Sequence, residues 1–333
     1  SNGALSVLSD TLHTPNQVHV VNSANASTAS DTPLNISAAI TAAFSPDSLK
    51  AYIIGGSAGT SLYVYSPLRA LQQYVPPATN TQLLLTEPGD AIAFSPNAAF
   101  AFVAESAPDG SSANLTAFAT CNDQIAGTMP LPSFSVPAPM FPNLRMKVLP
   151  NLHLDGRDSA GHPIPDGIHV LVLDSTGIDI ITSTISAPPA GSICPQGLTF
   201  ASNDPTNLFQ RIELGQGTLN PVNFFASPDG TQLYVVNANS SSILVYSFIS
   251  GSVVGGIELA GGVTPLSADM SSDGGTIAVA ASDGMLHEVS TQLGGSDLVQ
   301  LSFPNLPNYF NAFCTVTPPS GVPCILNTVL VKP

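Results

Sequence analysis

The densest group of residues able to do chemistry lies between positions 152 and 167. This segment has three aspartates, two histidines and an arginine, in a chain with only 9% charged residues. Carboxylate oxygens on a glycine-containing loop suit Ca²⁺, and histidine nitrogens would admit a transition metal. The spacing is not that of an EF-hand, so we favour a solvated hairpin extension without a cofactor and keep Ca²⁺ as the alternative. The candidate ligands are Asp155, Asp158, His162 and Asp166.

A second pattern, Gly55–Gly59, matches G-x-S-x-G, in which Ser57 would be a hydrolase nucleophile. A nucleophile elbow needs a strand before the serine and a helix after it. The apolar alternation of residues 61–65 instead predicts a strand after the serine. We therefore interpret the pattern as a loop and assign no catalytic residue.

The histidines form no acid–base group that the sequence can identify. His19, His169 and His287 fall within segments that read as strands, where packing is the commoner role of a lone histidine. We therefore expect each of them to be a packed or surface residue of a strand.

A repeated turn shows how the chain is organised. Ser45, Ser95, Ser227 and Ser271 each begin a segment similar to Ser-Pro-Asp-Gly that leads into an apolar strand. Proline presets φ and glycine accepts a positive φ, so each copy predicts a tight turn between two strands. A third and a fourth strand follow in most units. Four antiparallel strands in about 45 to 50 residues predict a β-propeller blade.

The second strands of these units centre near residues 52, 102, 171, 234, 278 and 329. We therefore predict an all-β fold with one propeller domain over residues 1–333 and six blades, with seven as the alternative. The segments 4–8 and 17–21 would complete the last blade and close the ring, which would remove exposed strand edges. Residues 1–3 are typical of the remnant of a cleaved expression tag.

The segment 227–246, which reads SPDGTQLYVVNANSSSILVY, resembles the YVTN-type propeller repeat. Its Tyr-Val-Val-Asn at 234–237 differs from Tyr-Val-Thr-Asn at one position. The resemblance implies a propeller of the kind found in secreted or surface-associated bacterial proteins, some of which are lactonases while others only bind. The motif residues build turns and strands, so the resemblance implies no catalytic residue.

The blade order predicts how the four cysteines pair. Cys121 and Cys194 fall between the third and fourth strands of adjacent units, and therefore on the same face. Cys314 and Cys324 bracket the first turn of the closing unit. We predict the disulfides Cys121–Cys194 and Cys314–Cys324, with a pair of free thiols as the alternative for the second. An even number of cysteines and a low lysine content favour an extracytoplasmic setting.

The charge excludes several classes of partner. Twenty-two acidic residues against seven basic ones give a formal net charge of −15, which argues against nucleic acid and anionic membrane surfaces. No apolar run reaches the length of a membrane span. With so few cations, a single one near the propeller channel could bind an anion, but the sequence does not show which.

Three hypotheses about function follow. The first, which we favour, is a monomeric, non-enzymatic secreted or cell-surface module that binds a protein, a small molecule or a carbohydrate. The second is a hydrolase of lactonase type that uses the channel, and the third is a structural module of a larger surface protein. The sequence does not distinguish the ligands.

Overall fold

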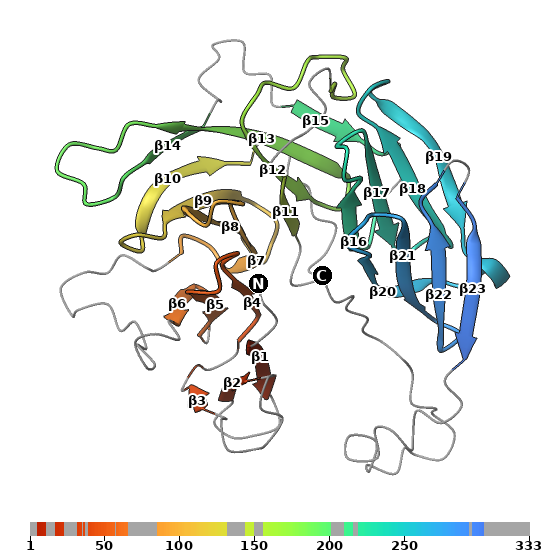
Figure 1. The fold of residues 1–333 in the computed structure, drawn as a ribbon, viewed down its shortest axis with the longest axis horizontal. Coiled ribbons are helices and arrows are strands. Elements are labelled where there is room, and N and C mark those ends of the chain that lie inside the picture. The colour runs from red at the N-terminus through yellow and green to blue at the C-terminus, as the bar shows by residue number, and fades with distance from the viewer. Residues whose placement is uncertain are drawn as a thin grey trace.

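The computed structural model describes residues 5–10, 17–22, 32–34, 36, 39–56, 58–65, 85–131, 144–149, 156–200, 210–215, 219–292 and 295–302. Regular structure in these ranges is β-strand, apart from one 3-10 helix, η3 (Ala260–Gly262). The strands form six antiparallel sheets that fan around a common centre (Figure 1). Within these ranges no helix has the length and apolar character needed to cross a membrane.

Two sheets of three strands come first in the chain. They comprise β1 (Leu5–Asp10), β2 (Gln17–Asn22) and β3 (Thr32–Leu34), then β4 (Thr41–Phe44), β5 (Ala51–Gly55) and β6 (Ser61–Tyr65). The third sheet comprises β7 (Gly89–Phe94), β8 (Phe100–Ser106), β9 (Ala113–Ala119) and β10 (Gln124–Pro130).

The later sheets have four or five strands. The five-stranded sheet comprises β11 (Arg145–Leu149), β12 (Ile168–Leu173), β13 (Gly177–Ser186), β14 (Gly197–Phe200) and β15 (Gln210–Glu213). The last two comprise β16 (Pro221–Ala226), β17 (Gln232–Asn237), β18 (Ser242–Ser247) and β19 (Ser252–Glu258), then β20 (Pro265–Met270), β21 (Thr276–Ala281), β22 (Met285–Ser290) and β23 (Asp297–Ser302).

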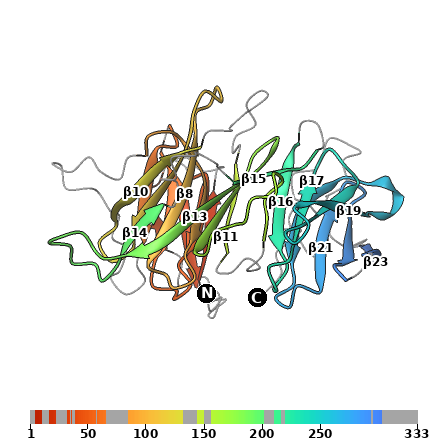
Figure 2. The same cartoon turned by 90° about the horizontal axis from the view of Figure 1, so that it is seen from above.

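The first strands of successive sheets line the centre of the fan. β4 lies beside β7, β7 beside β11, β11 beside β16, and β16 beside β20 (Figure 1). Figure 2 shows β11 and β16 between the earlier sheets and the later ones. We call β4, β7, β11, β16 and β20 the inner strands. The sequence prediction of repeated strand–turn–strand units is therefore confirmed for these five sheets.

The hydrophobic core is divided among the spaces between sheets, which we call seams. The second strands β5, β8, β12 and β17 are buried along nearly their whole length, in accord with their unbroken apolar sequences. Tyr52 of β5 shares a buried cluster with Val103 of β8, and Val236 of β17 shares another with Val279 of β21. Each sheet therefore depends on its neighbours for burial.

The repeated turn closes in the same way in all four copies. The Ser227 Oγ donates to Asp229 Oδ1 at 2.5 Å and accepts the amide of Gln232 at 2.9 Å. The corresponding bonds form at Ser45, Ser95 and Ser271. In the second copy Asn97 replaces the aspartate and accepts the serine hydroxyl at 2.7 Å.

A main-chain carbonyl at the rim of three seams links each sheet to the one before it. Thr120, Phe248 and Thr291 directly follow the third strands β9, β18 and β22. Their amides donate to equivalent carbonyls of their own sheets, those of Ala99, Thr231 and Gly275, at 3.0, 2.9 and 3.1 Å. We call the carbonyls of Thr120, Phe248 and Thr291 the seam carbonyls.

Each seam carbonyl accepts a hydrogen bond from the first hairpin of the preceding sheet, but the donor differs. The donors are the Lys50 ammonium, the Arg157 amide and the Tyr234 hydroxyl, in chain order. These donors are different groups at equivalent places, so at these three seams the bond does not depend on one motif residue.

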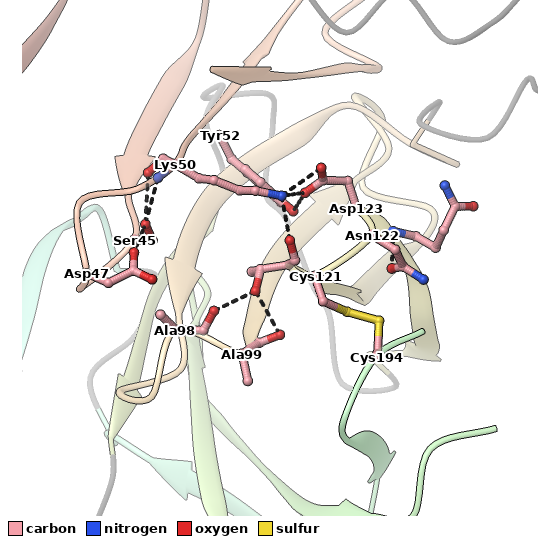
Figure 3. Close-up of polar contacts among 12 residues, drawn as sticks. Ser45, Asp47, Lys50, Tyr52, Ala98, Ala99, Cys121, Asn122, Asp123 and Cys194 are labelled. Atoms are coloured by element: carbon pink, nitrogen blue, oxygen red, sulfur yellow. Dashed lines mark hydrogen bonds and ion pairs between the residues drawn. A yellow bond between two sulfur atoms is a disulfide. The ribbon is translucent and has the colours of Figure 1, made fainter. Parts of the chain in front are cut away.

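An ion pair fills the seam between the β4–β6 and β7–β10 sheets (Figure 3). The Lys50 ammonium lies 2.7 Å from the Asp123 carboxylate, and the Tyr52 hydroxyl donates to the same carboxylate at 2.5 Å. Burial and the nearby Asp123 charge raise the pKa of Tyr52 well above its usual value. The tyrosine therefore stays protonated and acts as a donor.

The Cys121–Cys194 disulfide is confirmed, with Cα atoms 5.6 Å apart (Figure 3). It joins the β9–β10 connection to the β13–β14 connection, as the blade order predicts. Cys314 and Cys324 lie outside the described residues, and so do the expected last strands near 313–316 and 328–331. The segments at 4–8 and 17–21, expected to complete the last blade, pair with each other as β1 and β2, and β3 extends their sheet.

Removal of the disulfide should destabilise the protein strongly. The closed loop spans 73 residues, so the chain-entropy model gives on the order of 4 kcal/mol. We expect Cys121→Ser and Cys194→Ser each to lower the free energy of unfolding in urea by about 2 to 4 kcal/mol. The double variant should lose no more than either single one, and a full additive loss would contradict the pairing.

A glycine substitution should stabilise the second turn. The fourth turn residue has a positive φ in every copy, 67° at Gly230 and 57° at Ala98. The left-handed region costs a non-glycine residue about 1 to 2 kcal/mol. We expect Ala98→Gly to raise the free energy of unfolding by about 0.5 to 1 kcal/mol and Gly230→Ala to lower it by about 1 kcal/mol, both measured by urea unfolding. Effects of the same sign would be inconsistent with this account.

Candidate functional site

The residues of the proposed metal loop are not gathered into a ligand set. Asp158 is buried, and its carboxylate accepts the amides of Ala160 and His162 and contacts the His162 ring at 3.2 Å. Asp166 is exposed, and Asp155 lies outside the described residues. Among the described residues, no three His, Cys, Asp or Glu side chains lie close enough to hold a metal ion.

The expectation that this loop is a solvated extension is met only in part by its described residues, 156–167, because exposed residues such as Ala160 and Asp166 stand beside the buried Asp158 and Ile164. Its Arg157 amide donates to the Phe248 seam carbonyl at 2.8 Å, and the Arg157 carbonyl accepts the Tyr246 hydroxyl at 2.9 Å. Ile164 is buried in the cluster shared with the next sheet. The loop takes the place of the short turn in its unit and packs into the seam. The sequence did not predict this packing, because the loop is rich in charged residues.

The serine of the G-x-S-x-G pattern, Ser57, lies outside the described residues. The flanking Gly56 and Gly59 have positive φ and are joined by a turn hydrogen bond of 3.0 Å that leads into β6. A strand therefore follows the pattern, as expected for a loop between strands.

His287 is fully buried in β22 between two carboxylates. Its ring nitrogens lie 2.5 Å from Asp297 and 3.1 Å from Asp283, and the Asp297 carboxylate also accepts the Ala260 amide. Burial lowers the pKa of His287, but hydrogen bonds and charge attraction from Asp297 and Asp283 outweigh it, so the pKa is raised. The histidine ties the β21–β22 turn to β23.

The other two strand histidines also sit within sheets. His169 is buried in β12, and its Nε2 lies 2.7 Å from the Pro165 carbonyl. Burial lowers its pKa. His19 lies half-buried in β2, paired with Leu8 and Pro33.

A buried ion network accounts for Arg211, another of the seven basic residues. It lies on β15, 2.6 Å from Asp179 and 3.1 Å from Asp174. Burial raises the pKa of Asp179 in spite of this cation. β15, which was not anticipated from the sequence, is held to the first half of β13 by this network.

Partly buried polar side chains gather on the inner strands β11, β16 and β20. We call this set the inner polar row. Lys147, Phe225 and Asp269 occupy the same pairing position in their three sheets. Lys147 lies 5.4 Å from the centre of the Phe225 ring. The polar members are Arg145, Lys147, Asn223, Ser267 and Asp269.

Hydrogen bonds within the inner polar row run from one inner strand to the next. Arg145 Nε donates to the Val222 carbonyl of β16 at 3.2 Å, and Asn223 Nδ2 donates to the Ala268 carbonyl of β20 at 2.9 Å. These bonds fix both side chains at the strand boundaries.

The charges in the inner polar row are balanced. Burial lowers the pKa of Lys147, and attraction to Asp269 opposes the shift. Burial likewise lowers the pKa of Arg145, opposed by Asp90 on β7. The row thus presents fixed donors and acceptors side by side with compensated charge, which suits a polar, uncharged ligand better than an ion.

Comparison with known proteins supports the fold. No protein-family model and no curated protein matches the sequence. A functionally unknown protein from Desulfotomaculum acetoxidans has a similar structure, with a TM-score of 0.55 and 13% identity over 86% of this chain and 77% of that one. The β-propeller domain of Cps50 (Swd1) from Myceliophteria thermophila gives a TM-score of 0.51 and 11% identity over 80% of this chain and 73% of that one.

Kluyveromyces lactis Hsv2 matches over 91% of this chain and 80% of its own, with a TM-score of 0.50 and 10% identity. The chain is a β-propeller. At these identities the likeness shows the fold and no activity.

The raised pKa of His287 predicts a pH-dependent stability. A histidine whose folded pKa exceeds its unfolded value of about 6.5 stabilises the fold below that value, and this contribution is lost as the pH rises through the folded pKa. We expect the excess stability of the wild type over His287→Asn, measured by urea unfolding, to shrink between about pH 5.5 and about pH 8.5. An excess that grows over this range would show that the histidine is held neutral.

Proposed function

We propose that this protein is a non-enzymatic, extracytoplasmic binding propeller of six blades and the YVTN type, acting as a monomer without a cofactor, whose inner polar row binds a neutral carbohydrate. The observation that carries the proposal is the row itself. Five partly buried polar side chains lie on three adjoining inner strands. Small-molecule sites use a few fixed polar groups of this kind to orient a ligand.

The charge balance within the row favours a carbohydrate over an anion. Lys147 faces Asp269, and Arg145 faces Asp90, so an added carboxylate or phosphate would compete with an existing acid. Hydroxyl groups both donate and accept, and they can pair with the ammonium and the carboxylate at once. The Cys121–Cys194 disulfide supports the extracytoplasmic setting, because such bonds persist in oxidising compartments.

The proposal predicts binding that depends on the row. Neutral cello-, xylo- and chito-oligosaccharides are titrated into the wild type by calorimetry. We expect at least one series to bind, and Lys147→Met and Asn223→Ala to weaken that binding about tenfold or more. Arg157→Met is the matched control, since it removes one positive charge from an exposed side chain away from the row, while the seam bonds of Arg157 come from its main chain, and it should leave affinity unchanged.

Two results would contradict the proposal. One is the absence of binding by every series, and the other is equal affinity of the Lys147 and Arg157 variants. If the wild type hydrolyses a lactone and Lys147→Met abolishes this activity, the lactonase hypothesis would be supported instead.

A further inference from the structure

Two seams of the propeller are built on the same plan but end differently. In the first, Lys50 and Tyr52 follow the turn serine by five and seven positions. In the seam between the β16–β19 and β20–β23 sheets, Gln232 and Tyr234 stand at these places. Both tyrosines are buried, and both hydroxyls lie at the seam rim.

In the first seam the space at the rim is occupied by the Lys50 side chain. Its ammonium contacts both oxygens of Asp123, at 2.7 and 2.8 Å, and donates to the Thr120 seam carbonyl at 2.5 Å (Figure 3). The ammonium is thus surrounded by oxygen acceptors.

In the later seam the corresponding space is open. A shallow pocket of about 390 Å³, open to solvent and called the cavity below, lies between the two turns. The sequence explains part of the difference, because Gln232 replaces the lysine. The cavity is lined by Ser227, Pro228, Asp229, Thr231, Gln232, Tyr234, Gly274 and Thr291.

The lining of this cavity is rich in acceptors. The Thr291 seam carbonyl lies 3.0 Å from the Tyr234 hydroxyl, and Gln232 Oε1 lies 2.6 Å from the same hydroxyl. Asp229 is exposed, and hydrogen bonds from Ser227 and Thr231 lower its pKa, so it is ionised at neutral pH. Among the described residues its hydrogen bonds all reach Oδ1, which leaves Oδ2 able to accept another donor.

We propose that this cavity binds the ammonium group of a lysine side chain from a partner protein. The chain itself provides the template for the carbonyl, since an ammonium in the sister seam donates to the equivalent seam carbonyl and pairs with Asp123. In the later seam the carboxylate would come from Asp229 of the turn instead. The formal charge of −15 attracts a basic partner. This site is separate from the inner polar row, so the proposal stands independently of carbohydrate binding.

The test uses hexalysine with blocked termini as the probe, titrated by calorimetry at about 150 mM salt, where long-range attraction is screened. We expect binding by the wild type and a loss of about tenfold or more with Asp229→Asn. This variant should keep the turn, because Asn97 makes the same bonds in the second copy. Asp273→Asn is the matched control, since Asp273 occupies the same turn position outside the cavity lining.

A second variant, Gln232→Lys, introduces the residue found in the sister seam. We expect it to fill the cavity and weaken hexalysine binding at least tenfold without lowering the free energy of unfolding. Hexalysine with acetylated side chains should not bind. The proposal is overturned if the wild type does not bind hexalysine, if Asp229→Asn and Asp273→Asn weaken binding equally, or if the acetylated peptide binds as well.

Discussion

The hydrogen bond that each seam carbonyl accepts is the constraint on which the rest of the structure depends. The core lies between sheets, so each sheet buries its apolar residues against its neighbours, and the rims of three seams also satisfy a main-chain acceptor. Lys50, the Arg157 amide and the Tyr234 hydroxyl meet this requirement with three different chemistries. The acceptor is the same main-chain carbonyl in these seams, whereas the donor differs from blade to blade.

Because the donor differs between seams, the seams also differ in whether they leave space for a ligand. In the first seam the Lys50 side chain and its counter-ion Asp123 fill the rim. In the seam at Tyr234 the carbonyl is also hydrogen-bonded, but the cavity beside it is open and is lined by the ionised Asp229. The inner polar row likewise combines hydrogen bonds between sheets with polar groups that can meet a ligand. There Arg145 and Asn223 join successive inner strands through carbonyls, and polar surface remains half-exposed around them.

The parts of the structure that repeat could be predicted from the sequence. The Ser-Pro-Asp-Gly turns and the buried second strands carry local signals, and the blade order derived from them was enough to pair Cys121 with Cys194. β15 could not be predicted, because its four residues are held by the Arg211 ion network, a tertiary interaction. The packing of the 152–167 loop into a seam was missed for a similar reason. Its charged residues suggested solvent, yet Asp158 caps the loop from a buried position.

The sites lay beyond the sequence because they arise between blades. Nothing local links Lys147 to Phe225, or Gln232 to Thr291, since the residues in each pair belong to different sheets or to strands far apart in the chain. Lys50 and Gln232 occupy equivalent positions in the repeat, but only the structure shows that both lie at a seam rim.

The most direct test of this account is a double-mutant cycle on Lys50 and Asp123, with Lys50→Met, Asp123→Asn and the double variant measured by urea unfolding. The two residues are 73 positions apart and belong to neighbouring sheets, so only seam packing brings them together. The account predicts a coupling energy of about 1 to 2 kcal/mol, within the range for residues that share a network. A coupling energy near zero would contradict it, because the seam would then not be held at its rim.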